Sequence, residues 1–280
     1  MDRQKVVIVT GSSSGIGLET SILLARSGYT TYATMRDIDK AKPLREIAIN
    51  ESLPLTIIQL DVTKENSVSN AIESITKSSG RIDILVNNAR YGLTGAFEDL
   101  EIDEIKSLYE TNFFGLIRTT QSVLPVMRQQ KSGIIVNISS GLGRFGIATS
   151  SAYSSSKFAI EGLTESMSYE LEAFGIRTII VEPGIIKTNF LKSSKLARKA
   201  TDPNSPYRNF IQNMEKGMKN LIENGQDPRF VAEIILKAIE DPIPRIRYLA
   251  GKDVEQIMQI KSKLSDEDFH IMLKKMANLK

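Results

Sequence analysis

Short β-branched and apolar runs alternate with longer amphipathic segments along most of the chain, and this alternation restricts the possible folds most strongly. Strands are expected at 5–10, 30–35, 55–60, 82–86, 133–138, 177–181 and 245–250. Helical patterns cover 16–27, 39–50, 65–78, 102–130, 152–174 and 228–239. Several strand runs are almost continuously apolar, as in parallel strands buried on both faces. The sequence therefore predicts an α/β fold with a doubly wound parallel sheet and helices on both faces.

Local signals refine this expectation. Pro125 predicts a break or kink within 102–130, with another near Thr111, and Thr63 could cap the helix that follows it. The pattern becomes irregular and polar at 187–226, which we interpret as a lid inserted into a single domain that spans 1–280. Helices are expected again over 253–280.

Composition excludes several kinds of chemistry. The chain has no cysteine and one histidine, which removes disulfides, thiol nucleophiles, Ser-His-Asp hydrolysis and most zinc sites, so no metal is expected. The net charge of +3 comes from well-mixed charges, which gives no reason to expect nucleic acid as a partner. No run of 18 apolar residues suggests a membrane span. The N-terminus enters a strand at once, which favours a cytoplasmic protein without a signal peptide.

A glycine-rich turn joins the first strand to the first helix in VVIVTGSSSGIGLE. Glycines allow a tight turn and let backbone N–H groups approach a pyrophosphate at the positive end of a helix. The spacing is G-x-x-x-G-x-G rather than the general dinucleotide pattern. The candidate cofactor contacts in this turn are Gly11, Ser13, Ser14, Gly15, Ile16 and Gly17.

Further cofactor contacts are expected where the next strands end. Arg36 follows the second strand, where an acid would favour NAD and an arginine suits the 2′-phosphate of NADP. NADP(H) is therefore the favoured cofactor and NAD(H) remains possible, because Asp37 could pair with Arg36 or accept the ribose hydroxyls. Asp61 could accept from adenine or cap the next helix, and Val62 adjoins it. Asn88 and Ala89 end the fourth strand.

A tyrosine and a lysine lie four residues apart in a segment with strong helical character. Tyr153 and Lys157 would share one helix face, and a nearby ammonium lowers the pKa of a phenol toward the range of a general acid/base. Ser140 ends the fifth strand and could donate to a substrate carbonyl oxygen. Asn112 could hold a proton-relaying water or satisfy the backbone at a helix break.

Together, these motifs resemble the short-chain dehydrogenase/reductase family over about residues 5–190. The resemblance implies a Rossmann-type fold, NAD(P)(H), an alcohol or carbonyl substrate, and a homodimer or homotetramer assembled through long helices. It also implies that Tyr153 is the general acid/base, that Lys157 binds the nicotinamide ribose, and that Ser140 polarises the carbonyl. The remaining implied site residues are Asn112 in the proton relay, Pro183 and Gly184, and Thr188 at the carboxamide. Segments such as ATMRD look most like members that act on hydrophobic alcohols and ketones, including steroid and retinol dehydrogenases.

One residue departs from the family pattern. Arg90 follows Asn-Asn-Ala, where the family usually has a glycine that leaves space beside the cofactor. The arginine could be tolerated loop variation, could contact an anionic substrate, or could impair cofactor binding. We expect it to modify the active site without abolishing activity.

Other functions were weighed against this one. A non-catalytic NAD(P)-binding redox sensor or scaffold is the main alternative, because a fold does not dictate a function. An epimerase or dehydratase usually has a larger C-terminal domain, and an enoyl reductase spaces its tyrosine and lysine more widely.

Overall fold

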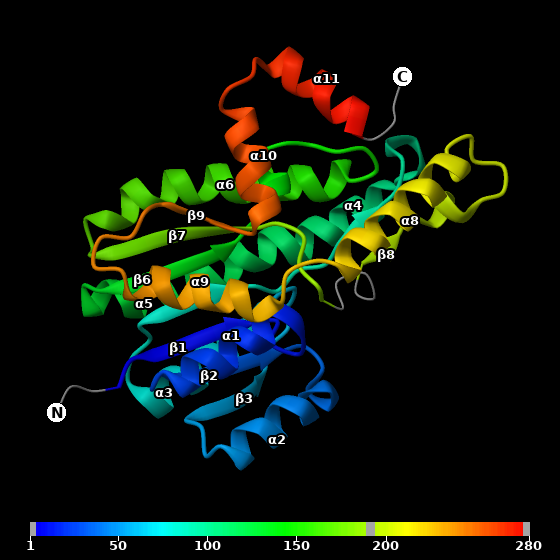
Figure 1. The fold of residues 1–280 in the computed structure, drawn as a ribbon. Helices are drawn as coiled ribbons and strands as arrows, with labels where there is room; N and C mark the ends of the chain where they lie inside the picture. The colour runs from blue at the N-terminus through cyan, green and yellow to red at the C-terminus, as the bar shows by residue number, and fades with distance from the viewer. Residues whose placement is uncertain (1–3, 189–193, 277–280) are drawn as a thin grey trace.

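A seven-stranded parallel sheet forms the centre of the protein in a computed structural model that describes residues 4–188 and 194–276 (Figure 1). The strands run in the order β3-β2-β1-β4-β6-β7-β9. Their bounds are β1 Val6–Thr10, β2 Thr30–Met35, β3 Leu55–Gln59, β4 Ile84–Asn87, β6 Gly133–Ile138, β7 Ile176–Pro183 and β9 Arg247–Ala250. A second, two-stranded parallel sheet pairs β5, Leu93–Thr94, with β8, Lys195–Leu196. The predicted doubly wound α/β fold is confirmed.

Helices connect the strands as right-handed parallel crossovers require. The α-helices are α1 Gly15–Arg26, α2 Lys42–Asn50, α3 Glu65–Ser79, α4 Ile102–Tyr109, α5 Gly115–Gln130, α6 Ser151–Glu172, α8 Arg208–Glu223, α9 Pro228–Glu240, α10 Lys252–Lys261 and α11 Asp266–Met276. A π-helical turn, η3, covers Glu110–Phe114, and short 3-10 turns cover Ile38–Ala41, Phe97–Asp99, Gly141–Gly143 and Arg198–Thr201.

The two faces of the sheet bury different sets of side chains. Alternate strand residues such as Val7 and Val9 pack with α1 and α9, and α2 covers the outer part of the same face. The opposite face, with Val6 and Ile8, packs against α3, α5 and α6. Figure 1 shows these layers on either side of the sheet. Both faces are therefore apolar, which explains the nearly continuous hydrophobic runs of the strands.

The direction of winding reverses between β1 and β4. The chain runs from β1 outward to β3, then returns to β4 beside β1 and continues outward in the other direction. Connections on the two sides of such a point diverge, which leaves a crevice at the carboxyl ends of the strands. The glycine-rich turn follows β1, and Asn88 and Ala89 follow β4, so both border this crevice.

Three local predictions need correction. Thr63 is not the cap of α3, because Lys64 occupies that position. Pro125 does not end a helix: α5 continues through it, and Pro125 lies on the exposed face, where a carbonyl that loses its hydrogen bond can be solvated. The segment 187–226 is less irregular than predicted, because it contains the 16-residue helix α8. The break expected near Thr111 is present as the π-helical turn between α4 and α5.

The C-terminal helices pack on the loop that follows β6. A Cβ atom at Gly141 would lie 2.7 Å from Val254 Cγ2 of α10. Phe269 of α11 makes an edge-to-face contact with Phe145, with ring centroids 5.8 Å apart. The last two helices therefore support the loop that begins at Ser140.

None of the helices in the described residues is long and apolar enough to cross a bilayer.

Candidate active site

The turn between β1 and α1 is shaped to receive a phosphate group. Gly11 and Gly15 have φ angles of +69° and +57°, a backbone conformation that strongly favours glycine. A Cβ atom at Gly17 would lie 2.4 Å from Asn88 Nδ2, so close packing also requires glycine there. Ser14 precedes α1 without a side-chain cap, and the first turn of the helix contains no acid. The helix N-terminus thus offers backbone N–H groups to an anion, which fits the pyrophosphate of a dinucleotide.

Asn88 fastens the end of β4 to this turn. Its Nδ2 donates to the carbonyl oxygens of Thr10 at 2.9 Å and Gly11 at 3.1 Å. In return, the Thr10 hydroxyl accepts from the backbone N–H groups of Asn88 and Ala89 at 3.0 and 3.1 Å. The two sides of the crevice are therefore joined by four hydrogen bonds at the point where the sequence predicts cofactor contacts.

The arginine after β2 is exposed and stands apart from its acidic neighbour. Asp37 forms an ion pair with Lys40 at 3.3 Å and accepts from Asp39 N at 3.1 Å, so it caps the following 3-10 turn. Within 4–188 and 194–276, the Arg36 side chain has no ion pair. The pairing of Asp37 with Arg36 considered above is thus not observed, and the guanidinium is available to a ligand.

Asp61 has a structural partner in its own loop. Its Oδ1 accepts from Thr63 N at 3.0 Å and from Thr63 Oγ1 at 2.8 Å. The adjoining Val62 is buried, and its carbonyl oxygen accepts from Arg118. These contacts shape the turn that precedes α3, but Asp61 does not cap that helix, because Lys64 is its N-cap. A contact of Asp61 with adenine stays a prediction.

The segment after β7 turns back toward the glycine-rich turn. A Cβ atom at Gly15 would lie 3.2 Å from Thr188 Cγ2, which places Thr188 beside the start of α1. Asp253 of α10 holds the preceding turn by accepting from Ile185 N at 2.7 Å, and it leaves no room for a side chain at Gly184. Sequence reasoning missed Asp253, because it lies 68 residues from Ile185 in the chain.

The predicted catalytic residues meet near the same edge of the sheet. Tyr153 and Lys157 lie on one face of α6, with Lys157 Nζ 5.7 Å from the centroid of the Tyr153 ring. Lys157 is almost fully buried and donates to the Ile138 carbonyl oxygen at 2.9 Å. Ser140 lies close enough to the Tyr153 phenol to act on its pKa, which it lowers. A phenol, an amine and a hydroxyl thus lie together, and the first two are buried.

The pKa of Tyr153 is not lowered, as the nearby Lys157 alone would predict, but raised. Burial raises the pKa of the Tyr153 phenol above 10, and the charge of Arg90 together with the nearby Ser140 offsets only part of that rise. Burial also places the pKa of the Lys157 amine well below 10.5, and Arg90 lowers it further, while Glu161 acts in the opposite direction. A lowered Tyr153 pKa was expected from the ammonium alone, but burial outweighs it because both groups are removed from water.

Asn112 lies in the π-helical turn and fixes the loop after β4. Its Oδ1 accepts from Tyr91 N at 3.0 Å, and its Nδ2 donates to Tyr91 O at 2.9 Å. The extra residue of a π-helical turn re-aims side chains, and such turns are frequent at functional sites. Asn112 thus satisfies the backbone of the loop after β4 rather than that of the helix break, and its part in a proton relay stays a prediction.

Arg90 points into the site and does not swing away from it. Its Nη1 donates to Asn88 Oδ1 at 2.8 Å and to the Asn88 carbonyl oxygen at 3.3 Å. Its positive charge acts to lower the pKa of the Tyr153 phenol. The departure from the family glycine therefore lies near the predicted acid/base.

A buried pair of carboxylates lies behind Lys157. Glu161 forms an ion pair with Arg247 at 2.9 Å, and Glu182 pairs with Arg144 at 3.0 Å and with Arg247 at 3.5 Å. Burial and the charge of Glu182 raise the pKa of Glu161 to about 7, although contacts with Ser139 and Arg247 act against the rise. Sequence reasoning missed this cluster, because its members come from separate elements and no short motif contains them.

Tyr153 belongs to an apolar cluster. The buried members are Leu93, Ala96, Leu100, Leu108, Ala152, Tyr153, Ala197, Ala200 and Ile211. Leu196 and Tyr207, two of the predicted lid residues, pack against this cluster, whereas Phe190 and Leu191 fall outside the described residues.

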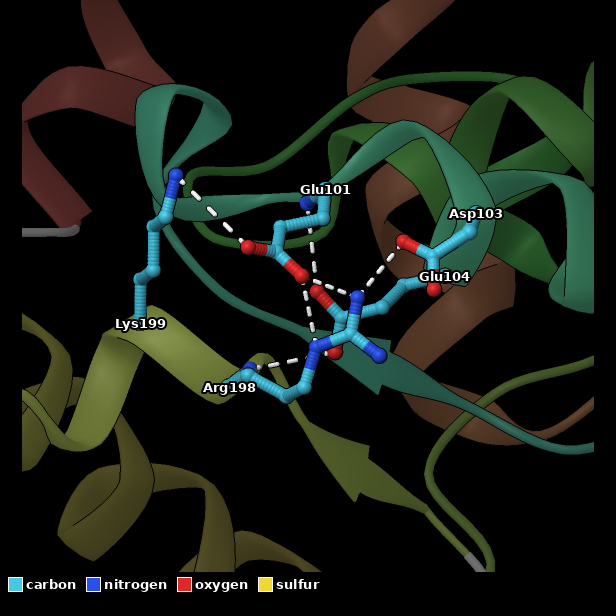
Figure 2. A network of polar contacts seen from close by, with 5 residues as sticks. All are labelled: Glu101, Asp103, Glu104, Arg198 and Lys199. Atoms are coloured by element: carbon cyan, nitrogen blue, oxygen red, sulfur yellow. Dashed lines mark hydrogen bonds and ion pairs between the residues drawn. The ribbon is translucent and has the colours of Figure 1, made fainter.

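Charged side chains hold the 3-10 turn Arg198–Thr201 against the start of α4. Arg198 pairs with Glu101 and with Asp103, the latter at 2.6 Å, and its backbone N–H donates to Glu104 Oε1 at 3.0 Å. Lys199 adds an ion pair with Glu101 at 3.7 Å. Figure 2 shows these side chains converging from the two segments. The segment around Arg198 is thereby kept beside the apolar cluster.

Comparison with known proteins agrees with this geometry. The family model for short chain dehydrogenase matches residues 5–199. The chain belongs to the short-chain dehydrogenase family. Retinol dehydrogenase 8 from Bos taurus is 38% identical over 93% of this chain and 86% of its own length. The 17-beta-hydroxysteroid dehydrogenase type 1 from Homo sapiens is 36% identical over 87% of this chain and 76% of its own length. A short-chain dehydrogenase from Streptomyces avermitilis superposes with a TM-score of 0.81 at 30% identity, covering 94% of this chain and 95% of that one.

Membership of this family establishes the class of reaction. The protein is an NAD(P)-dependent short-chain dehydrogenase/reductase. Among the predicted residues, the structure brings the glycine-rich turn, Asn88 and Thr188 together on one side, and Ser140, Tyr153 and Lys157 on the other. Arg36, Asp61 and Val62 lie farther along the same edge, after β2 and β3.

Proposed function

We propose that this dehydrogenase interconverts a hydrophobic alcohol and its aldehyde or ketone, prefers NADP(H), and uses Tyr153 as its general acid/base. The main support is the position of Tyr153, which lies near Ser140 and Arg90 within the apolar cluster at the edge of the sheet where the glycine-rich turn lies. Burial strengthens each of these electrostatic interactions.

The chain's own residues then have distinct tasks. When bound, the nicotinamide donates or accepts the hydride at the substrate carbon. In the reduction direction, Tyr153 donates its phenolic proton to the carbonyl oxygen and regains one from solvent, and in the oxidation direction its phenolate accepts the alcohol proton. Ser140 donates to the oxygen on which charge develops. Lys157 would hold the nicotinamide ribose, and the turn from Gly11 to Gly17 would hold the pyrophosphate.

The preference for NADP(H) rests on Arg36. The side chain is exposed at the end of β2 without an ion pair in the described part of the chain, while Asp37 is engaged with Lys40. A free guanidinium can bind a phosphate through two parallel hydrogen bonds. We expect Arg36→Ala to weaken NADPH binding about tenfold or more with little effect on NADH. Arg45→Ala, on the exposed face of α2, is the matched control.

The preference for a hydrophobic substrate rests on the apolar cluster around Tyr153. Two relatives have names that specify retinol and 17-beta-hydroxysteroids, and both are hydrophobic alcohols. Decanal and propanal differ only in apolar length, and each buried CH₂ group contributes about 0.8 kcal/mol. We therefore expect a much larger kcat/KM for decanal. Equal values for the two aldehydes would contradict an apolar pocket.

The first test is a titration with NADPH and NADH, followed by turnover of decanal, benzaldehyde and retinal. Tyr153→Phe should lower kcat by about 100-fold or more while NADPH still binds. Tyr169→Phe, an exposed tyrosine on the same helix, should behave like the wild type. Full activity of Tyr153→Phe would refute the acid/base assignment. NADPH binding without turnover of any carbonyl would favour the redox sensor or scaffold.

We also infer a homodimer or homotetramer. Large apolar side chains are exposed on and beside α5 and α6: Phe158 lies on α6, Phe114 ends the π-helical turn before α5, and Phe174 follows α6. Such surfaces commonly mark interfaces. Light scattering should give a multiple of the 31.1 kDa chain mass. The cytoplasmic location stays a prediction from the sequence.

A further inference from the structure

The side-chain amide of Asn88 is bonded at both of its polar atoms. Its Nδ2 donates to the carbonyl oxygens of Thr10 at 2.9 Å and Gly11 at 3.1 Å, on the glycine-rich turn. Its Oδ1 accepts from Arg90 Nη1 at 2.8 Å. Among the described residues, only Arg90 donates to this oxygen. The Asn88 amide therefore connects Arg90 to the turn that is shaped for a pyrophosphate.

The direction of this amide decides whether it can hold the turn. An amide has an oxygen that only accepts and a nitrogen that only donates. Turned over, the Asn88 side chain would present its oxygen to two carbonyl oxygens, and the hydrogen bonds to Thr10 and Gly11 would be lost. A guanidinium can only donate, so its contact with Asn88 Oδ1 selects the orientation in which Nδ2 faces the turn.

The amide has little space in which to move. A Cβ atom at Gly17 would lie 2.4 Å from Asn88 Nδ2, and a Cβ atom at Gly11 would lie 3.2 Å from the same atom. The Asn88 side chain is also buried, so an amide oxygen left without a donor would lose free energy that bulk water does not restore. The bond from Arg90 therefore supports a tightly packed contact between β4 and the turn.

Arg90 is well placed to supply this bond. Its Nη1 also donates to the Asn88 backbone carbonyl oxygen at 3.3 Å, which directs the side chain back along its own loop. Both backbone groups of the next residue, Tyr91, are paired with the Asn112 side chain, so the loop itself is fixed. A guanidinium keeps its charge across the working range of pH, and hydrogen bonds from charged donors are stronger than those from neutral ones.

We propose that Arg90 is a positioning residue for the cofactor, because its bond to Asn88 Oδ1 locks the amide that keeps the glycine-rich turn in its phosphate-receiving shape. This rests on the proposed function, in which that turn holds the pyrophosphate. Of the three options for Arg90, tolerated variation and impaired cofactor binding are thereby rejected. NADPH and NADH share the pyrophosphate, so Arg90 supports both cofactors equally.

The test is the affinity of Arg90→Gly, Arg90→Ala and Arg90→Lys for NADPH and NADH, measured by nicotinamide fluorescence. We expect Arg90→Gly, which restores the family residue, and Arg90→Ala to weaken both cofactors by a similar factor of about tenfold or more. Arg90→Lys keeps a charged donor and should weaken them less. Arg45→Ala, which removes an exposed arginine from α2, is the control and should bind as the wild type does.

The alternatives predict different results for the same variants. Tighter binding by Arg90→Gly would mean that the arginine obstructs the cofactor, and unchanged binding would mean that it is tolerated variation; either result overturns the proposal. A double-mutant cycle with Asn88→Ala tests the route of the effect. Arg90→Ala should cause little further loss when Asn88 is already alanine. An equal loss in both backgrounds would show that Arg90 acts on the cofactor without Asn88, and would also overturn the proposal.

A second measurement needs no cofactor. Hydrogen exchange of the cofactor-free protein should be faster in Arg90→Ala for a peptide that covers 10–17, whereas a peptide from α3 should keep its rate. Unchanged exchange in 10–17 would contradict the lock. If exchange rises and affinity falls as expected, but the wild type with NADPH reduces none of decanal, benzaldehyde and retinal, the proposed function fails while the role of Arg90 in cofactor binding stands.

Discussion

The buried carboxyl of Glu161 should make the stability of the protein fall as the pH rises toward neutrality. Its side chain is 5% exposed, and burial together with the neighbouring Glu182 raises its pKa from 4.5 to about 7. Between these two values the folded chain keeps a proton that the unfolded chain releases. The stabilisation is therefore fully present below pH 4.5 and is lost as the pH rises through 7.

The size of this effect follows from the two pKa values of Glu161. Each pKa unit corresponds to 1.36 kcal/mol, so the change from 4.5 to about 7 amounts to about 3 kcal/mol. Glu161→Gln carries a neutral side chain of the same shape at every pH. The unfolding free energy of this variant minus that of the wild type should therefore rise by about 2 to 3 kcal/mol from pH 5 to pH 8.

Urea denaturation at a fixed protein concentration, repeated at pH 5, 6, 7 and 8, measures this difference. Glu165→Gln is the matched control, because Glu165 lies one turn later on α6, is exposed, and pairs with the same Arg247 at 2.8 Å. The difference in unfolding free energy between Glu165→Gln and the wild type should stay nearly constant with pH. A constant difference for Glu161→Gln, or one that changes in the opposite direction, would refute the reasoning.

Three further changes test other parts of the structure. Gly17→Ala places a Cβ 2.4 Å from Asn88 Nδ2, so the turn must shift and NADPH affinity should fall about tenfold or more. An unchanged affinity would show that the turn does not hold the cofactor. Arg198→Ala removes exposed ion pairs and should leave the urea midpoint of unfolding nearly unchanged; a clearly lower midpoint would assign these contacts a larger role in stability. Asn137→Ala removes two buried side-chain hydrogen bonds, to Asn87 and to Thr164, and should lower stability by about 2 to 4 kcal/mol in urea; a smaller loss would mean that water replaces the amide.

The elements that sequence reasoning predicted are those whose signal is local. The strands are buried on both faces, which makes them continuous apolar runs, and most of their bounds agree to within two residues. Tyr153 and Lys157 were found because four residues on a helix bring two side chains onto one face. The glycine-rich turn was found because positive φ angles at Gly11 and Gly15 require glycine.

What the sequence did not reveal depends on contacts between distant segments. Arg90 was noticed only as an irregularity, since nothing in its neighbourhood shows that α6 brings Tyr153 near its guanidinium. Glu161 is one helical turn after Lys157, but its high pKa depends on Glu182 in β7. Helix α8 was missed although its apolar residues, from Phe210 and Ile211 to Leu221 and Ile222, recur at helical spacing, because the polar composition of 187–226 was given more weight than this periodicity.

The contact of α10 with the turn after β7 has a consequence for how the protein is made. Synthesis delivers the glycine-rich turn first, then Tyr153, and Asp253 only 100 residues after Tyr153. Until then the Gly184–Ile185 backbone lacks its acceptor, and the Ser140 loop lacks the support of Val254. A nascent chain that has not reached α10 thus possesses every residue of the reaction centre without the support that fixes its geometry.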